Sequence, residues 1–501
     1  MTIASAIADG ATADAPPQGF AARVRGAVIW RSGSQILAQL ITWAATFMVI
    51  RLLDPNDYGL FAMTGAIVVF LNLLNGHGFT AALVQNESID RRRIAQVFGI
   101  MILLNAGLAL AQILLAPLAA AYFRQPAVAD MLRVQALLYA ATPFIALPNA
   151  LLSRQLEFRK QAKVNLVSAI LSAATALGCA LAGAGVWTLV AAPIVLFWTR
   201  AIGLTVAARW LVWPSFRFAG AGALFGYGGA MAGVQLLWFL QSQSDIFIAG
   251  RWLDAHQLGL YTTALFLTQI LAAKFVPPLN EVAFAAYSRI QGDRDMMASA
   301  FIKASRLIML VALPFYFGLA VAAEPLILTF LGPKWIGIAA IVPVLALAMP
   351  FLTLQILVAP ATNALGRPRI AVATGLAGAL ILPAAFLIGI SGGIAGLAYA
   401  WLGGAFLLLA ATVALSAPVI GVGMGDLARA VRPALLAASA MAALVFAADW
   451  LLPPLRPAAR LAILVTLGAA VYAGLLFAFA RRTVEEVLIL IRAPAAEPAG
   501  L

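Results

Sequence analysis

The chain of 501 residues is 63% hydrophobic and only 10% charged, with a mean hydropathy of +0.98. A water-soluble domain carries about 25% charged residues, so this composition excludes a soluble globular protein and indicates a membrane protein. The net charge of +13 comes from basic residues between the apolar runs, which fits contact with anionic lipid and not with nucleic acid. The runs reach about 20 residues, too long for barrel strands, so we expect an all-α membrane protein.

Clusters of charge, glycine and proline divide the chain into about fourteen expected spans. Residues 1–22 precede them and lack a basic start followed by an apolar core, so we expect a disordered cytoplasmic tail there and no signal peptide. The first six spans are expected near 31–51, 59–81, 95–121, 132–152, 164–183 and 187–208, and the next six near 222–249, 258–280, 300–322, 336–358, 369–390 and 394–416. The last two are expected near 433–452 and 460–480.

The basic residues predict the orientation of these spans. Most of the 32 Lys and Arg, including the run Arg91–Arg93, fall on the side that holds both chain ends. The positive-inside rule then places both termini in the cytoplasm. No loop is long enough to form a folded soluble domain, so we expect no enzyme, no catalytic residue, no cofactor and no metal site.

A short repeat organises the chain. The stretch RLLDPNDYGLF begins at Arg51, and RWLDAHQLGLY begins at Arg251, with five of eleven positions identical. Six expected spans separate the two stretches, so the halves share one orientation. We therefore expect two six-helix bundles, at 23–209 and 210–416, followed at 417–501 by two accessory helices and a cytoplasmic tail. Parallel repeats with a site between the halves are typical of secondary transporters.

Several longer stretches resemble one known family. They are RLLDPNDYGLFAMTGAIVVFLNLLNGHGFTAALVQ in the first half, and in the second DIFIAGRWLDAHQLGLYTTALFLTQILAAKFVPPLNEVAFAAYSRIQGD, LPFYFGLAVAAEPLILTFLGPKW and NALGRPRI. Over roughly residues 25–415 the chain resembles Wzx-type flippases of the multidrug/oligosaccharidyl-lipid/polysaccharide exporter superfamily.

The resemblance implies a V-shaped pair of bundles with a lateral opening to lipid. It also implies flipping of undecaprenyl-pyrophosphate-linked oligosaccharide across the bacterial inner membrane by alternating access, for exopolysaccharide, capsule or O-antigen. Polysaccharide polymerase and chain-length proteins would be partners, and H⁺ or Na⁺ the coupling ion. Some superfamily members couple through an acid on the first span, and this chain has none between Arg23 and Arg51.

Polar side chains recur at helical spacing on the two spans that the repeat relates. On the first span they are Ser32, Gln35, Gln39, Thr42 and Thr46, and on the seventh Gln235, Trp238, Ser242 and Asp245. Each set lies on one helix face. We expect Gln35, Gln39, Gln235, Trp238 and Ser242 to line opposite walls of a substrate cleft, with Asn72 of the second span extending the lining. The alternative is that they form hydrogen bonds between helices inside a bundle.

Two cations lie deep within expected spans. Lys274 follows Tyr261 by thirteen residues, about 20 Å into the membrane, and Arg200 lies at a similar depth in the sixth span. Such charges are costly and mark functional sites by default, so both are expected to bind the substrate diphosphate. Pro277 and Pro278 are expected to break the helix beside Lys274. The alternative is snorkelling or a structural ion pair.

Two acids are candidates for ion coupling. Asp245 lies within the seventh span and is expected to carry a proton, while Glu281 lies near the cytoplasmic mouth. The alternative for Asp245 is a structural pair with Arg251 or a hydrogen bond to a neighbouring helix. Arg51 and Arg251 are candidates for a periplasmic gate, with capping of helix ends as the alternative.

Two other functions compete with the flippase. A drug/cation antiporter of the same superfamily would need acids in the cleft, where the sequence offers cations. A membrane glycan polymerase or glycosyltransferase would need a large periplasmic loop. The Asp293–Asp295 stretch DRD matches an Asp-x-Asp metal–nucleotide motif, but its loop is short and basic.

Overall fold

The computed structural model describes residues 20–73, 75, 91–155, 157–209, 213–216 and 222–479, without the side chains of 20–32, 91, 93, 222–234 and 479. Within these ranges the regular structure is entirely helical, as expected. The first half holds α1 (Phe20–Leu52), α2 (Pro55–Asn72), α4 (Arg91–Phe123), α5 (Ala127–Gln135), α6 (Leu137–Arg154), α7 (Phe158–Leu181) and α8 (Trp187–Ala208). Most of the expected N-terminal tail lies outside the described residues, as does the C-terminal one.

The second half repeats the pattern with more interruptions. It holds α9 (Gly222–Trp252), α10 (Ala255–Arg289), α11 (Arg294–Val321), α12 (Ala323–Phe330), η2 (Pro333–Ile338), α13 (Val342–Ile356), α14 (Val358–Ala364), α15 (Pro368–Gly389), η3 (Ile390–Gly392) and α16 (Gly393–Ile420). The chain then adds α17 (Met424–Leu451) and α18 (Pro457–Phe479).

Eleven segments of the described chain are long and apolar enough to cross a membrane, so the protein is a multi-pass membrane protein. One of them, Pro368–Ile420, contains the two helices α15 and α16. Helices α2 and α9 occupy the second and seventh expected spans without being among the eleven. The predicted break at Pro277 and Pro278 is wrong, because α10 runs through both residues. A proline removes one backbone N–H, and its ring clashes with the preceding turn. A long helix can accommodate both effects by bending at the proline without ending there.

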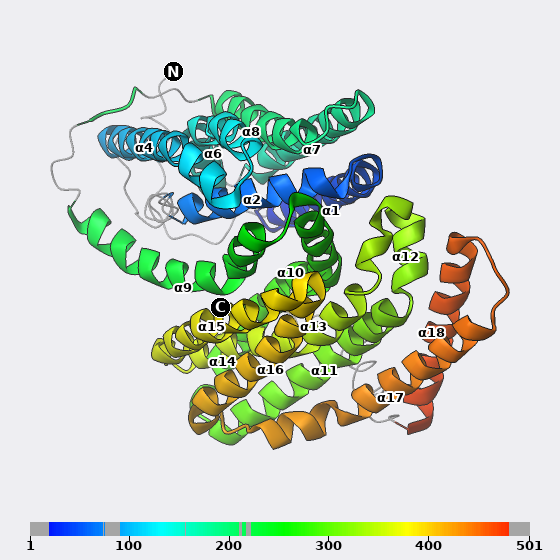
Figure 1. Cartoon of the computed structure of the whole chain (residues 1–501). Helices are drawn as coiled ribbons and strands as arrows, with labels where there is room; N and C mark the ends of the chain where they lie inside the picture. Colours follow the sequence, from blue (N-terminus) through cyan, green and yellow to red (C-terminus); the bar gives the residue numbers. More distant parts are fainter. Residues whose placement is uncertain are drawn as a thin grey trace.

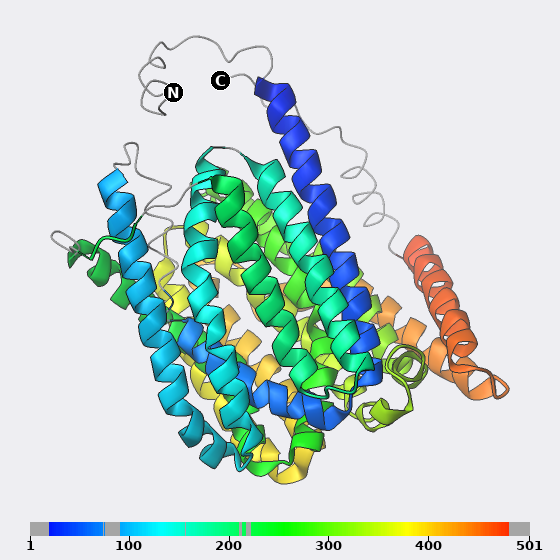
Figure 2. The ribbon, with the colours of Figure 1, turned by 90° about the horizontal axis from the view of Figure 1, so that it is seen from above.

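The helices form two bundles and a peripheral pair. In the first half α7 packs on α1 and α8, and α6 packs on α8. In the second half α16 packs on α13 and α15, and α15 also packs on α9. Helices α17 and α18 lie at one side of the molecule, where α17 packs on α11 and α18 rests on α17 and α12 (Figures 1 and 2).

The repeated sequence lies where the two halves cross. A Cβ on Gly59 of α2 would overlap the carbonyl of Ala255, and a Cβ on Gly259 of α10 would overlap the carbonyl of Pro55. Each glycine thus lets the backbone of the other half's helix come into direct contact, and α2 and α10 pack closely as a result. The repeat therefore encodes a crossing in which each half supplies the same glycine.

The aspartates of the repeat serve the same helices. Asp254 is the N-cap of α10, and its Oδ1 accepts a hydrogen bond of 2.7 Å from the backbone N–H of Gln257. Asp54 occupies the equivalent N-cap position of α2, where its own N–H donates to Asp57 at 3.2 Å. These caps satisfy N–H groups at helix starts that have no intrahelical partner.

Candidate functional site

Two arginines related by the repeat bind the opposite half of the molecule. Arg51, at the end of α1, donates from Nη1 to the carbonyl of Thr329 in α12 at 2.8 Å. Arg251, at the end of α9, donates from Nη1 to the carbonyl of Tyr122 in α4 at 3.0 Å. Each arginine caps a carbonyl near the C-terminal end of a helix, where cations are favoured. The two contacts join the halves on one side of the bundle, called the Arg51 end below.

Further contacts close the Arg51 end. The buried indole of Trp335 donates to the carbonyl of Ile50 at 2.8 Å, and its ring packs edge-on against Tyr58 with centroids 5.4 Å apart. Lys334 forms a 2.7 Å ion pair with Asp54. The Lys334–Asp54 pair is solvent-exposed and contributes little to stability. The hydrogen bond from the buried indole of Trp335 instead fixes the two halves relative to each other at this point. The halves are therefore in direct contact at this end.

A central cavity of about 400 Å³ lies beside this closure. Its wall comes from α1, α2, α7 and α8 of the first half and from α10 of the second. Most of the lining is apolar, with hydroxyl groups supplied by Thr42, Thr46, Ser172, Thr188, Thr262 and Thr263. Several of these hydroxyls, such as that of Thr46, donate to their own helix backbone and keep only acceptor capacity.

The predicted cation Arg200 lies next to this cavity. On α8, Pro193 and Leu196 line the cavity, and Arg200 follows Leu196 by one turn on the same face. Arg200 is half-buried, and its Nε has no hydrogen-bond partner among the described residues. On α1, Gln39 and Gln35 continue the face of Thr42 and Thr46 away from the Arg51 end. An unpaired guanidinium therefore adjoins the cavity at the end where the polar lining continues.

A second cavity has a different character. This lateral groove has a volume of about 860 Å³ and lies among α1, α10, α11, α12, α17 and α18. Its lining is aromatic and aliphatic, with Trp43 and Phe47 from α1, Phe330 from α12 and Phe477 from α18. The hydroxyl of Tyr472 donates to the carbonyl of Leu310 at 2.8 Å and so ties α18 to α11 across the groove.

Helices α1 and α10 form the seam between the two cavities. Neighbouring residues on α1 face opposite ways: Thr46 lines the central cavity and Phe47 lines the groove. Phe47 meets Phe266 of α10, which lines the central cavity, with ring centroids 6.4 Å apart. The hydroxyl-bearing cavity and the wholly apolar side of the groove therefore adjoin each other along α1 and α10, with the Phe47–Phe266 contact between them.

Lys274 lies on α10 below this seam. It follows Leu267, which lines the groove, by two turns, or about 10 Å, on the same face. Thr263, which lines the central cavity, lies one turn before Leu267. The side chain of Lys274 is exposed, with neither hydrogen bond nor ion pair to any described residue. The structure thus offers an unneutralised cation on the helix that borders both cavities.

Asp245 lies elsewhere, inside the second half. It is 2% exposed and accepts a 2.8 Å hydrogen bond from the hydroxyl of Tyr261 on α10. Trp401 of α16 donates to that same hydroxyl at 2.7 Å. Of the two expected structural alternatives, the pair with Arg251 does not occur, because Arg251 reaches the carbonyl of Tyr122 instead, whereas the hydrogen bond to a neighbouring helix does. Asp245 is a buried carboxyl held by neutral donors.

The remaining predicted residues do not gather in one site. Gln235 and Trp238 are exposed on α9, and Ser242 is half-buried, but these residues do not line the central cavity. The expected opposite wall is supplied by α10 instead. Asn72 is exposed and pairs with Asn75 at 3.4 Å, and Glu281 is exposed on α10 two turns beyond Lys274.

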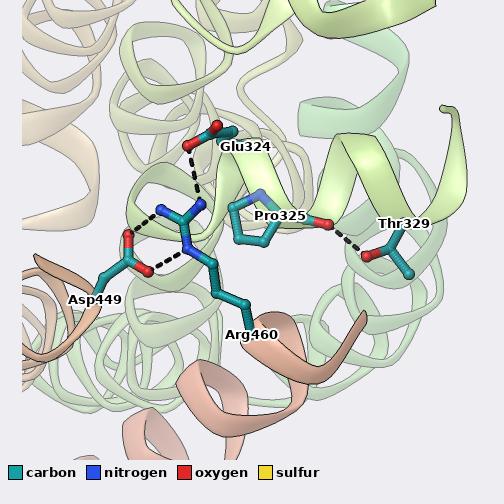
Figure 3. A network of polar contacts seen from close by, with 5 residues as sticks. All are labelled: Glu324, Pro325, Thr329, Asp449 and Arg460. Atoms are coloured by element: carbon teal, nitrogen blue, oxygen red, sulfur yellow. Dashed lines mark hydrogen bonds and ion pairs between the residues drawn. The ribbon is translucent and has the colours of Figure 1, made fainter. Parts of the chain in front are cut away.

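The sequence reasoning missed the groove and the ion network beside it. Arg460 of α18 binds Asp449 of α17 and Glu324 of α12 (Figure 3). The available signal was the pairing of Asp449 with Arg460 across a short turn between two apolar runs. Such a pair at a hairpin end indicates a fixed helix pair and not a loose accessory one.

Comparison with known proteins agrees with this architecture. Residues 48–340 match the model of a family described as polysaccharide biosynthesis protein. The chain is 27% identical over 325 residues to the succinoglycan biosynthesis transport protein ExoT of Rhizobium meliloti (strain 1021), covering 64% of this chain and 66% of that protein. It is 22% identical over 306 residues to the lipopolysaccharide biosynthesis protein WzxC of Escherichia coli (strain K12), covering 60% of this chain and 61% of that one. The matches span slightly under two thirds of these relatives' length.

Solved structures share the fold. The lipid II flippase MurJ in an inward closed conformation superposes with a TM-score of 0.73 at 12% identity, covering 91% of this chain and all of that one. A multidrug resistance MATE family transporter of the MOP superfamily, in an inward-facing conformation, gives a TM-score of 0.55 at 14% identity over 76% of this chain and 95% of that one. The expected superfamily fold is confirmed.

Proposed function

The chain belongs to the polysaccharide biosynthesis protein family, and we propose that it is a flippase that carries undecaprenyl-pyrophosphate-linked oligosaccharide across the bacterial inner membrane by alternating access. Such a substrate joins a hydroxyl-rich, anionic head to a long apolar chain. Moving the head through hydrocarbon unaided is prohibitive, because each polar group would lose its hydrogen bonds to water. A carrier must shelter the head and leave the chain in an apolar environment.

The adjacency of the two cavities carries this proposal. The central cavity offers hydroxyl groups and adjoins Arg200, while the lateral groove offers only apolar lining apart from Tyr472. Because the seam between them is a single pair of helices, one molecule can place its head in the cavity and its chain in the groove. The polar residues Gln35 and Gln39 extend the head-binding wall along α1. A water-soluble substrate would have no use for the groove.

Lys274 is the proposed anchor for the diphosphate. The diphosphate joins the head to the chain, so it must lie near the seam, and Lys274 lies two turns below the seam on α10. Lysine acts as a mobile point charge, whereas Arg200 can bind phosphate in bidentate fashion. We assign Lys274 the diphosphate and Arg200 a supporting role at the cavity.

The Arg51 end is the proposed periplasmic gate. The excess of basic residues toward the opposite end supports the proposal that that end and both termini face the cytoplasm. Arg51 and Arg251 then hold the periplasmic side closed, and the glycine crossing of α2 and α10 is a further closing contact. Asp245 is the proposed carrier of a coupling proton, because it is buried without a paired cation among the described residues. Its partner Tyr261 lies on α10 and accepts in turn from Trp401 on α16, so this chain of hydrogen bonds joins three helices.

The test is export of surface polysaccharide in a deletion strain complemented with Lys274→Ala at matched protein level. Lys274→Ala removes a charge that has no partner among the described residues, so folding and expression should hold. We expect export to collapse and lipid-linked precursor to accumulate on the cytoplasmic leaflet. Lys303→Ala, which removes an exposed cation from α11, is the matched control and should export normally. Near-normal export by Lys274→Ala would reject the diphosphate anchor.

A further inference from the structure

The short helix α12 connects the peripheral pair to the gate. At its start, Glu324 accepts a 3.3 Å hydrogen bond from Nη1 of Arg460 on α18 (Figure 3). The same guanidinium binds both carboxylate oxygens of Asp449 on α17, at 2.6 and 2.7 Å. Bidentate pairs of this kind fix orientation as well as distance. Arg460 therefore fixes the α17–α18 turn and the start of α12 relative to one another.

The other end of α12 belongs to the gate. The carbonyl of Thr329 accepts the hydrogen bond from Arg51 of α1, while the hydroxyl of Thr329 donates back to Pro325 at 2.6 Å (Figure 3). Leu326, between these ends, and Phe330, the last residue of α12, line the lateral groove. One helix of eight residues thus touches the peripheral pair, the groove and the gate.

The groove takes its walls from both halves. Trp43 and Phe47 come from α1 in the first half, and every other lining residue comes from the second half or from α17 and α18. The two parts of the wall meet where the rings of Phe47 and Phe330 are in contact, with centroids 5.8 Å apart. If the halves separate at the Arg51 end, α1 leaves α12 and the groove loses one wall. A chain bound there would lose its contacts on that side.

We propose that the lateral groove is a state-selective site: a polyprenyl chain within it stabilises the closed periplasmic gate, and α12, held by Arg460, transmits this effect. The inference rests on the proposed function for the identity of the chain. A ligand shifts an equilibrium only if it binds the two states differently. The two-sided wall supplies that difference, because only the closed state completes the groove. The α17–α18 pair then has a defined role, which is to position α12 against the groove.

The experiment measures gate opening with the full chain in lipid nanodiscs of phosphatidylethanolamine and phosphatidylglycerol. Spin labels are attached at Ala182→Cys on the α7–α8 turn and Ser391→Cys on the α15–α16 turn, both exposed, with Cys179→Ala removing the native thiol. Pulsed EPR then reports the distance between the halves at the Arg51 end. The probe is undecaprenyl phosphate, and farnesyl phosphate is the control with the same head and a short chain.

Undecaprenyl phosphate should raise the ratio of closed to open molecules by about five- to 150-fold, the usual range of coupling between sites, and farnesyl phosphate should leave it unchanged. Arg460→Gln should reduce that response at least fivefold. The control Arg456→Gln, which changes an exposed arginine of the same turn, should keep it.

Equal distances with and without undecaprenyl phosphate, or an equal response to farnesyl phosphate, would overturn the inference. Export in the deletion strain tests the proposed function separately: normal export without a polyprenyl response would reject this inference alone.

Discussion

The crossing of α2 and α10 allows a sharp test of how the gate closes. Gly59→Ala adds one methyl group where the carbonyl of Ala255 lies, so the closed crossing must spread apart. Overpacking of this kind costs about 1–3 kcal/mol. Since 1.4 kcal/mol corresponds to a tenfold change in an equilibrium, the ratio of closed to open molecules should fall by about five- to 150-fold.

Gly65→Ala is the matched control on the same helix. A Cβ at Gly65 has no atom within 4 Å, so it should only add helix propensity, up to about 1 kcal/mol. The assay is the spin-label distance between Ala182→Cys and Ser391→Cys, together with the melting temperature in detergent. Gly259→Ala should behave like Gly59→Ala, because its methyl group would meet the carbonyl of Pro55. If Gly59→Ala and Gly65→Ala gave the same distance distribution, the symmetric crossing could not be the closing contact.

Two further predictions concern coupling and orientation. Asp245→Asn keeps the acceptor for Tyr261 but removes the titratable group. Transport driven by a pH gradient should therefore be abolished, while folding and substrate binding persist. Unchanged transport would show that the role of Asp245 is structural only. A reporter fused after Arg492 should be active only in the cytoplasm, and one inserted near Gln125 should be active only in the periplasm. The opposite result at either position would reject the predicted orientation.

The repeat shows how far the sequence could predict this molecule. Composition and apolar length predicted the membrane helices, and the repeated stretch predicted two halves of one orientation. Each identical polar or glycine position of the repeat now has a physical role. Arg51 and Arg251 bind the opposite half, Asp54 and Asp254 lie at helix starts, and Gly59 and Gly259 allow the crossing. Repetition marked these positions because each half makes the same kind of contact with the other.

The arrangement of the site was harder to predict, because helical spacing shows which residues share a face but not which helix that face meets. The polar set on α9 has the same spacing as the set on α1, yet the wall opposite α1 in the central cavity comes from α10. The hydrogen bonds around Asp245 also could not be read from local sequence, since its partner Tyr261 is held by Trp401, 140 residues further along the chain. The groove depends on six helices at once, a packing that no local pattern encodes.

The most direct measurement of the central claim is translocation of an undecaprenyl-pyrophosphate-linked oligosaccharide by the purified full chain in proteoliposomes. The labelled lipid is placed in both leaflets, and a glycan-cleaving enzyme added outside removes only the outward-facing heads. Nearly all label should become cleavable when the protein is present, and about half should remain protected in protein-free vesicles or with Lys274→Ala. Persistent protection of half the label by intact, correctly folded protein, under a pH gradient as well as without one, would contradict the assignment as a flippase for this substrate.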